Sequence, residues 1–144
     1  MTEQLSSAPG ALGVQTARWP FVRLVRPRQW IKNGLVLAAP AAAGVLDEGH
    51  YLGRALVVAI SFCIAASGTY CLNDAADAEA DRVHPTKRLR PVASGEVTVA
   101  QARTLGIALL VAGVGLGLVT GTWEASAITG LYVALSTAYT VWLK

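Results

Sequence analysis

The chain has 144 residues, of which 53% are hydrophobic and only 15% are charged. Soluble domains carry about a quarter charged residues, so this composition favours a membrane protein. The net charge of +3 is spread along the chain and forms no patch of the kind that binds nucleic acid. The two cysteines, Cys63 and Cys71, share one apolar segment, which indicates buried apolar side chains rather than a disulfide or a metal site.

The N-terminal region divides into two parts. Residues 1–17 are small and polar and lack the basic start and apolar core of a signal peptide, so they predict a flexible tail. Residues 18–32 alternate Arg and Lys with large apolar side chains, a composition typical of a segment that lies in the membrane interface. Pro20 and Pro27 predict two short pieces there rather than one long helix.

Four apolar stretches follow, at about 33–46, 53–72, 104–120 and 125–143. A helix needs roughly 17 to 25 residues to cross the hydrocarbon core of a bilayer. The last three stretches reach that length, whereas the first contains Pro40 and reaches it only with Trp30 and Ile31 added. Small residues crowd the third stretch and predict an interior packing helix. We therefore expect an all-α membrane protein with about four transmembrane helices.

The basic residues predict how this bundle is oriented. If the N-terminus is cytoplasmic, eleven of the twelve Lys and Arg residues fall on the cytoplasmic side, and only Arg54 lies outside. Cytoplasmic loops carry such an excess of positive charge. The pattern therefore predicts that both termini are cytoplasmic, in a multi-pass protein of the plasma (inner) membrane.

A stretch of mixed charge, residues 73–91, follows the second apolar stretch on the cytoplasmic side. On an α-helix Asp74, Asp77 and Asp81 lie within about 60° of one another, because each residue turns the helix by about 100°. Asn73 is next to this stripe and offers an amide oxygen. Oxygen ligands without His or Cys favour a hard cation, Mg²⁺ before Ca²⁺.

Cationic side chains follow the acidic stripe. Lys87, Arg88 and Arg90 lie between two prolines, which favour a shaped loop over a continuing helix. Lys and Arg bind phosphate oxygens, Arg in bidentate fashion. The stretch therefore predicts a site where Mg²⁺, held partly through water, meets a phosphate ligand. One alternative stays open, in which these charges only solvate a loop beyond a span.

Several motifs resemble a known family. NDAADAEAD (73–81) resembles the first aspartate-rich motif, NDxxDxxxD, of the UbiA superfamily of intramembrane prenyltransferases. RPRQWIKN (26–33), DRVHPTKRLRPVASGEV (81–97) and AYTVWLK (138–144) resemble its phosphoribosyltransferase branch. The resemblance covers about residues 18–144. It implies a Mg²⁺-dependent transferase that moves 5-phosphoribose from phosphoribosyl diphosphate to a polyprenyl (decaprenyl) phosphate, in the synthesis of arabinan precursors for a cell wall.

The resemblance also implies roles for individual residues. The catalytic aspartates are expected to be Asp74, Asp77 and Asp81, which with Asn73 bind Mg²⁺ and, through it, the diphosphate. The basic positions expected to face phosphate are Lys87 and Arg90. The further contacts expected with phosphate or substrate are Lys32, Tyr139 and Lys144.

The family pattern is longer than this chain. It implies about nine transmembrane helices and a second aspartate-rich motif, of which residues 33–144 would supply the N-terminal half. We therefore expect catalysis to require a C-terminal half or a homo-oligomeric partner. Two other hypotheses stay open at this point. One is the same fold transferring a prenyl group to an aromatic acceptor in a quinone or haem pathway, and the other is a non-catalytic four-helix membrane protein.

Overall fold

The computed structural model describes residues 19–44, 47–121 and 123–142, and within these ranges every regular element is a helix. The predicted tail, residues 1–17, lies outside the described residues. The elements in chain order are α1 (Pro20–Val25), η1 (Pro27–Gln29), α2 (Trp30–Asn33), η2 (Gly34–Leu37), α3 (Ala38–Ala42), α4 (Gly49–Ala76), α5 (Ala78–Val83), η3 (Lys87–Leu89), α6 (Val99–Gly117), η4 (Leu118–Thr120) and α7 (Trp123–Trp142), where η marks a 3₁₀ helix.

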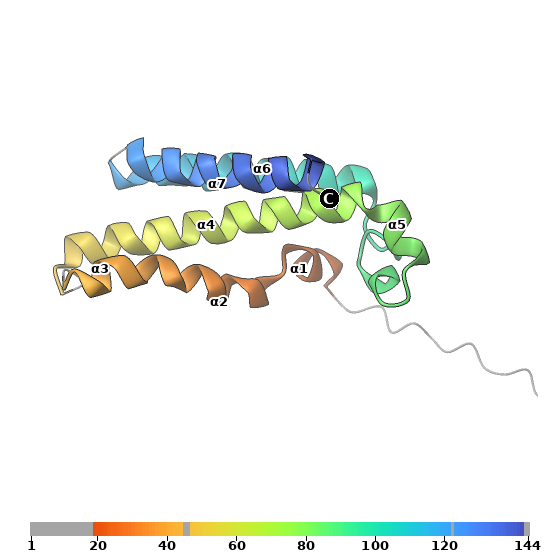
Figure 1. Cartoon of the computed structure of the whole chain (residues 1–144), viewed down its shortest axis with the longest axis horizontal. Helices are drawn as coiled ribbons and strands as arrows, with labels where there is room; N and C mark the ends of the chain where they lie inside the picture. Colours follow the sequence, from red (N-terminus) through yellow and green to blue (C-terminus); the bar gives the residue numbers. More distant parts are fainter. Residues whose placement is uncertain (1–18, 45–46, 122, 143–144) are drawn as a thin grey trace, which may run out of the picture.

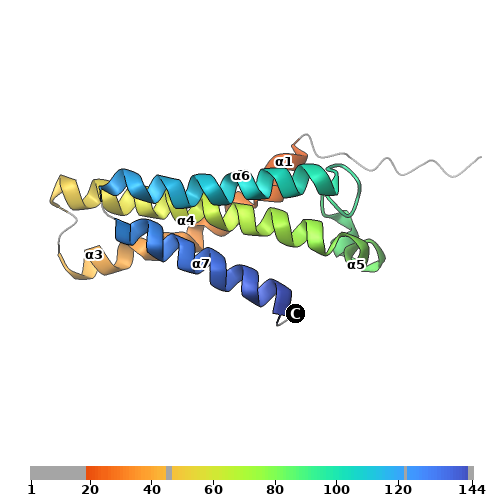
Figure 2. The same ribbon diagram turned by 90° about the horizontal axis from the view of Figure 1, so that it is seen from above.

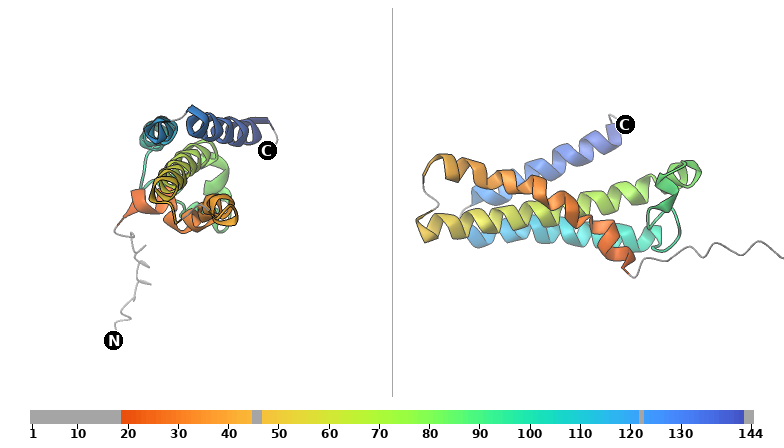
Figure 3. Two further views of the ribbon diagram at one scale, coloured as in Figure 1. Left: turned by 90° about the vertical axis from the view of Figure 1, so that its left-hand side faces the viewer. Right: turned by 90° about the horizontal axis from the view of Figure 1, so that it is seen from below.

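Helix α4 is the centre of the fold. It is the longest helix, with 28 residues, and it packs against α6, α7 and the N-terminal segment. Figure 1 shows α6 and α7 along one side of α4 and the segment from α1 to α3 along the other. The end-on view in Figure 3 (left) places α4 between these two layers. The residues at the end of α4 are therefore covered from two sides.

Glycines allow α4 and α6 to approach closely. A Cβ atom on Gly113 of α6 would lie 2.8 Å from the backbone nitrogen of Ala65 in α4, and one on Gly68 of α4 would lie 2.7 Å from the carbonyl oxygen of Gly106. The prediction that small residues make α6 a packing helix is confirmed for this face. On the opposite face Val111 is 69% exposed, because no described helix covers that side of α6.

Two helices in the described ranges are long and apolar enough to cross a membrane, namely Gly49–Ala76 and Val99–Thr120. They coincide with the second and third predicted spans. The first predicted span is helical without a break from residue 30 to residue 42, but it alternates between α and 3₁₀ geometry in α2, η2 and α3. Helix α7 occupies the fourth predicted span with 20 residues. The count of four spans and their orientation stay predictions.

The segment that was predicted to lie in the membrane interface packs against α4. Its break at Pro27 is confirmed, because α1 ends at Val25 and η1 begins at Pro27. Leu24 is fully buried in a small core with Cys71 of α4 and with Val92 of the loop before α6. The Ser67 hydroxyl donates to the Val25 carbonyl at 2.9 Å. This segment is therefore a wall of the protein interior as well as a basic and aromatic arm.

Candidate functional site

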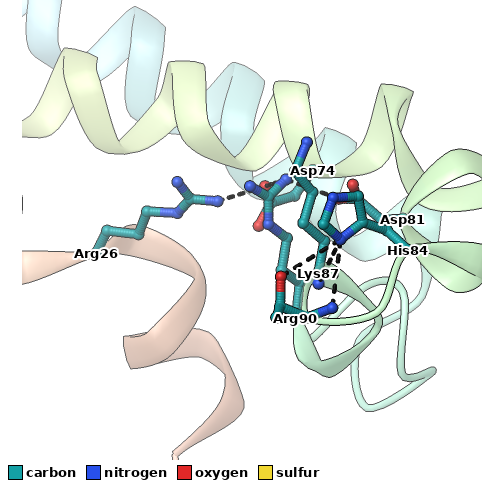
Figure 4. Close-up of polar contacts among 7 residues, drawn as sticks. Arg26, Asp74, Asp81, His84, Lys87 and Arg90 are labelled. Carbon is teal, nitrogen blue, oxygen red and sulfur yellow. Dashed lines mark hydrogen bonds and ion pairs between the residues drawn. The ribbon is translucent and has the colours of Figure 1, made fainter.

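Two buried carboxylates meet one arginine at the end of α4. Asp74 and Asp81 are 2% and 3% exposed. Arg90 Nη1 lies 2.7 Å from Asp81 Oδ2 and 3.3 Å from Asp74 Oδ1 (Figure 4). A buried carboxylate is costly unless it is paired and hydrogen-bonded. Arg90 therefore neutralises both acids and ties the loop before α6 to the helix end.

A second arginine reaches Asp74 from the N-terminal segment. Arg26 Nη2 donates to Asp74 Oδ1 at 2.7 Å, and the Arg26 guanidinium carbon lies 4.8 Å from the centre of the Tyr70 ring. Figure 4 shows Arg26 and Arg90 approaching Asp74 from different segments. Arg26 has φ +52°, in the left-handed region that costs a non-glycine residue about 1–2 kcal/mol. This conformation ends α1 and starts η1 at the position from which the side chain contacts Asp74.

The local backbone explains why Asp74 and Asp81 share a side. Helix α4 ends at Ala76, and Asp77 separates it from α5. The i to i−4 bonding nevertheless continues, with Asp77 N donating to Asn73 O at 2.9 Å and Asp81 N donating to Asp77 O at 2.8 Å. Residues 74 and 81 therefore keep a nearly helical relation. The predicted stripe of aspartates is thus interrupted at Asp77 rather than carried by one unbroken helix.

A basic cavity lies beside Asp74. It has a volume of about 900 Å³ and lies between the N-terminal segment and the loop that contains η3. Its charged lining residues are Arg23, Arg26, Arg28, Lys87 and Arg90, with Asp74 as the single acid among them. Such an excess of positive charge in a concave site attracts anions. We call this space the basic cavity.

Hydrogen bonds hold the two walls of the basic cavity together. The Arg23 guanidinium donates to both carboxylate oxygens of Glu96, at 3.1 and 3.0 Å, and to the Leu89 carbonyl at 2.6 Å. His84 Nδ1 accepts from the backbone N–H groups of Thr86 and Lys87, each at 3.3 Å. The turn that carries Lys87 is therefore ordered by the protein itself.

A second cavity lies between α4 and α7. Its volume is about 380 Å³, and its lining residues are Ala66, Thr69, Tyr70, Asn73, Tyr132, Leu135 and Ser136. Figure 2 shows α7 diverging from α4 toward the C-terminal end of α7. The polar groups of this cavity are amide and hydroxyl groups, in contrast to the cations of the basic cavity. Asn73 and Asp74 are adjacent in sequence but line different cavities.

Comparison with known proteins decides the family. Residues 34–144 match the model of the UbiA prenyltransferase family. The chain belongs to the UbiA prenyltransferase family. The decaprenyl-phosphate phosphoribosyltransferase of Corynebacterium glutamicum is 44% identical over 123 residues, which cover 83% of this chain and 37% of that protein. The enzyme of the same name from Mycolicibacterium smegmatis is 45% identical over 131 residues, which cover 86% of this chain and 40% of that protein.

Other members of the UbiA family also match. The protoheme IX farnesyltransferase of Korarchaeum cryptofilum is 33% identical over 122 residues, which cover 84% of this chain and 40% of that protein. The chain thus spans about two fifths of the length of these three relatives. The acidic and basic stretch, residues 73–91, lies entirely within the region that matches the family model.

The structure distributes the remaining predicted UbiA site residues unevenly. Lys87 lines the basic cavity with Arg90. Arg88 and Lys32 are exposed and line neither of the two cavities described above. The Tyr139 side chain and Lys144 lie outside the described part of the chain. Their proposed contacts, like those of the aspartates with a metal, stay predictions.

The acidic motif of this UbiA chain fits Mg²⁺ in its donor chemistry. Asn73, Asp74, Asp77 and Asp81 offer only oxygen atoms, which this ion prefers. Within the described ranges, however, no three His, Cys, Asp or Glu side chains converge as a ready metal site. Arg90 occupies the position between Asp74 and Asp81 that a bridging cation would take. An ion held by these two carboxylates would compete with Arg90 for them.

Three arginines of the site were missed by reasoning from sequence. Arg23, Arg26 and Arg28 were interpreted as interfacial cations, yet all three line the basic cavity. A signal was available, since a stripe of buried acids needs cations, and the sequence places these three ahead of the first span. Nothing in the sequence, however, indicates that the segment folds back over the end of α4.

Proposed function

We propose that this protein transfers 5-phosphoribose from phosphoribosyl diphosphate to a polyprenyl phosphate, most simply decaprenyl phosphate. The observation that carries the proposal is the basic cavity directly beside the buried acidic motif. A donor with phosphate groups at both ends of a sugar needs several cations near its leaving group. Support comes from the two relatives that bear the name decaprenyl-phosphate phosphoribosyltransferase, at 44% and 45% identity.

The reaction breaks one bond and forms one bond. The bond between ribose C1 and the diphosphate oxygen breaks, and diphosphate leaves with the electron pair. An oxygen of the lipid phosphate then forms a bond to C1, where positive charge has developed. The acceptor phosphate is already an anion, so the step needs no strong base. The task of the protein is to orient both substrates and to stabilise the charge of the leaving group.

The residues of this chain divide that task. The side chains that bind phosphate oxygens are those of Lys87 and Arg90, which lie on the loop that contains η3. The ion pair between Arg26 and Asp74 holds the N-terminal wall against α4. Asn73 and Asp77, with Asp74 and Asp81, would hold Mg²⁺, which when bound supplies neutralising charge to the diphosphate.

The placement in the membrane is part of the proposal. Four spans, with both termini cytoplasmic, put eleven of the twelve basic residues on the cytoplasmic side of a plasma membrane. The basic cavity then opens toward the aqueous phase that contains the soluble donor. The product, a phosphoribosylated lipid, would serve as a precursor of cell-wall arabinan.

A donor assay tests the proposed reaction. Membranes containing the whole protein are incubated with decaprenyl phosphate, Mg²⁺ and either labelled phosphoribosyl diphosphate or labelled prenyl diphosphate. We expect label to enter the lipid phase only from the phosphoribosyl donor, and chelation with EDTA to abolish the transfer. Asp77→Asn should lower turnover at least a hundredfold, since it removes a charge from the proposed metal site. Transfer only from the prenyl donor would reject the proposal.

A prenyltransferase is the second candidate. The specific observation in its favour is the 33% identity to a protein named protoheme IX farnesyltransferase. This function would move a prenyl group to an aromatic acceptor. The prenyl-donor arm of the same assay, run with aromatic acceptors, detects it directly.

A further inference from the structure

The cations of the basic cavity fall into two groups. Arg23 bonds to Glu96 and Leu89, while Arg26 and Arg90 bond to Asp74, with Arg90 also bonding to Asp81. Arg28 and Lys87 line the same cavity, and within the described residues neither forms a hydrogen bond or an ion pair through its side chain. Two positive charges therefore remain uncompensated at one concave site.

These two cations come from opposite walls that are fixed to each other. Arg28 belongs to η1, where Gln29 N donates to Arg26 O at 2.9 Å, and Lys87 begins η3. The Arg23 guanidinium joins the walls by bonding to Glu96 and to the carbonyl of Leu89, two residues after Lys87. The walls therefore need little reorganisation on binding, which reduces the entropic cost of capturing a ligand.

Arg28 and Lys87 match the chemistry of a phosphate monoester. A guanidinium binds two phosphate oxygens in parallel, and an ammonium adds a compact charge. A phosphate monoester carries close to two negative charges at neutral pH, which equals the uncompensated charge of the pair. Phosphoribosyl diphosphate carries such a group at its 5-position, at the far side of the sugar from the diphosphate. A prenyl diphosphate carries phosphate at one end only.

We propose that Arg28 and Lys87 form a subsite for the 5-phosphate of the sugar donor and so determine the choice of phosphoribosyl diphosphate over a prenyl diphosphate. The proposal rests on the proposed function, and it assigns a role to Arg28 that the motif residues do not have. The diphosphate end of the donor then lies toward the acidic motif. The Arg26–Asp74 ion pair joins the wall that contains Arg28 to the end of α4.

Calorimetric binding to the whole protein in lipid nanodiscs tests the subsite. The ligands are ribose 5-phosphate, phosphoribosyl diphosphate and farnesyl phosphate, the last a short polyprenyl monophosphate with the same headgroup chemistry. We expect Arg28→Gln and Lys87→Gln each to weaken both ribose ligands about tenfold, since each removes a charge-assisted contact. Farnesyl phosphate should bind these variants as it binds wild type. Arg103→Gln is the matched control, because Arg103 is an exposed cation of α6 that does not line the cavity.

The possible results distinguish failure of the proposed subsite from failure of the proposed reaction. Wild-type affinity for ribose 5-phosphate in both variants, with their melting temperatures unchanged, would overturn the subsite even if the donor assay succeeds. Selective weakening of farnesyl phosphate would also overturn it, because the pair would then serve the lipid phosphate. The proposed function fails by a different result, the absence of transfer from phosphoribosyl diphosphate. In the active protein, the variants should raise KM for the donor about tenfold and change kcat less, whereas loss of a merely structural contact would lower the melting temperature.

Discussion

Arg26 Nη2 lies 2.7 Å from Asp74 Oδ1, across 48 positions of the sequence. This ion pair joins a short N-terminal segment to the end of the central helix. It also brings an arginine that the sequence places before the first span into contact with the acidic motif. The N-terminal segment is consequently part of the candidate site.

Asp74→Asn should destabilise the fold. The change leaves the Arg26 and Arg90 guanidinium groups beside a neutral amide at a position that is 2% exposed. Removing one partner of a buried ion pair costs about 3 kcal/mol. The measurement is thermal unfolding in nanodiscs, followed by tryptophan fluorescence. Glu79→Gln is the control, since Glu79 pairs with Arg82 at the surface and its loss should leave the melting temperature close to that of wild type.

Arg26→Gly should be more stable than Arg26→Ala. Both variants lose the contact with Asp74, so they differ only in how well residue 26 adopts φ +52°. Glycine has no Cβ and takes this conformation freely, which predicts an advantage of about 1 kcal/mol over alanine. Thermal unfolding of the two variants side by side measures the difference. Equal melting temperatures would show that the left-handed conformation is not maintained without the ion pair.

Ser67→Ala should loosen the N-terminal segment. The Ser67 hydroxyl accepts from Trp30 Nε1 at 2.9 Å and shares its proton between the carbonyls of Val25 and Cys63, each at 2.9 Å, so it connects α4 to two parts of that segment. Losing the bonds to Trp30 and Val25 costs about 1–2 kcal/mol. We expect trypsin to cleave faster after Arg23 and Arg28, measured by mass spectrometry.

Thr69→Val is the control for that change. Among the described residues, the Thr69 hydroxyl bonds only to the Ala65 carbonyl, within the same helix, at 3.2 Å. Its removal should leave cleavage in the N-terminal segment at the wild-type rate. If both variants were cleaved equally fast, the effect would belong to α4 as a whole rather than to the Ser67 bridge.

Gly113→Ala should separate α4 from α6, whereas Gly115→Ala should be tolerated. A Cβ on Gly113 would lie 2.8 Å from Ala65 N, a backbone atom that cannot yield locally. Overpacking of this kind costs about 1–3 kcal/mol. Nothing lies within 4 Å of a Cβ on Gly115, so alanine there should stabilise the helix by up to about 1 kcal/mol. Thermal unfolding of both variants measures these opposite effects, and similar melting temperatures would contradict the close approach.

The sequence alone predicted the long helices and the place where charge gathers. Helices α4 and α6 coincide with apolar stretches long enough to cross a bilayer, and the break at Pro27 follows from the geometry of proline. Such features depend on local composition and period, which a sequence displays directly. The sequence did not indicate that the first predicted span alternates between α and 3₁₀ geometry, nor which face of α6 packs against α4.

Only the tertiary structure decided which cations form ion pairs with which acids. The sequence places Lys87, Arg88 and Arg90 nearest to the aspartates, and of these the structure brings Arg90 onto Asp74 and Asp81 and leaves Arg88 exposed. Arg26 joins them from a distant segment because Leu24 and Ser67 dock α1 against α4. Pairings of this kind depend on how helices pack, and packing is a relation between distant residues that no local pattern encodes. The physical reason is burial, since an acid enclosed at the end of α4 is stable only with a cation in contact, whatever its position in the chain.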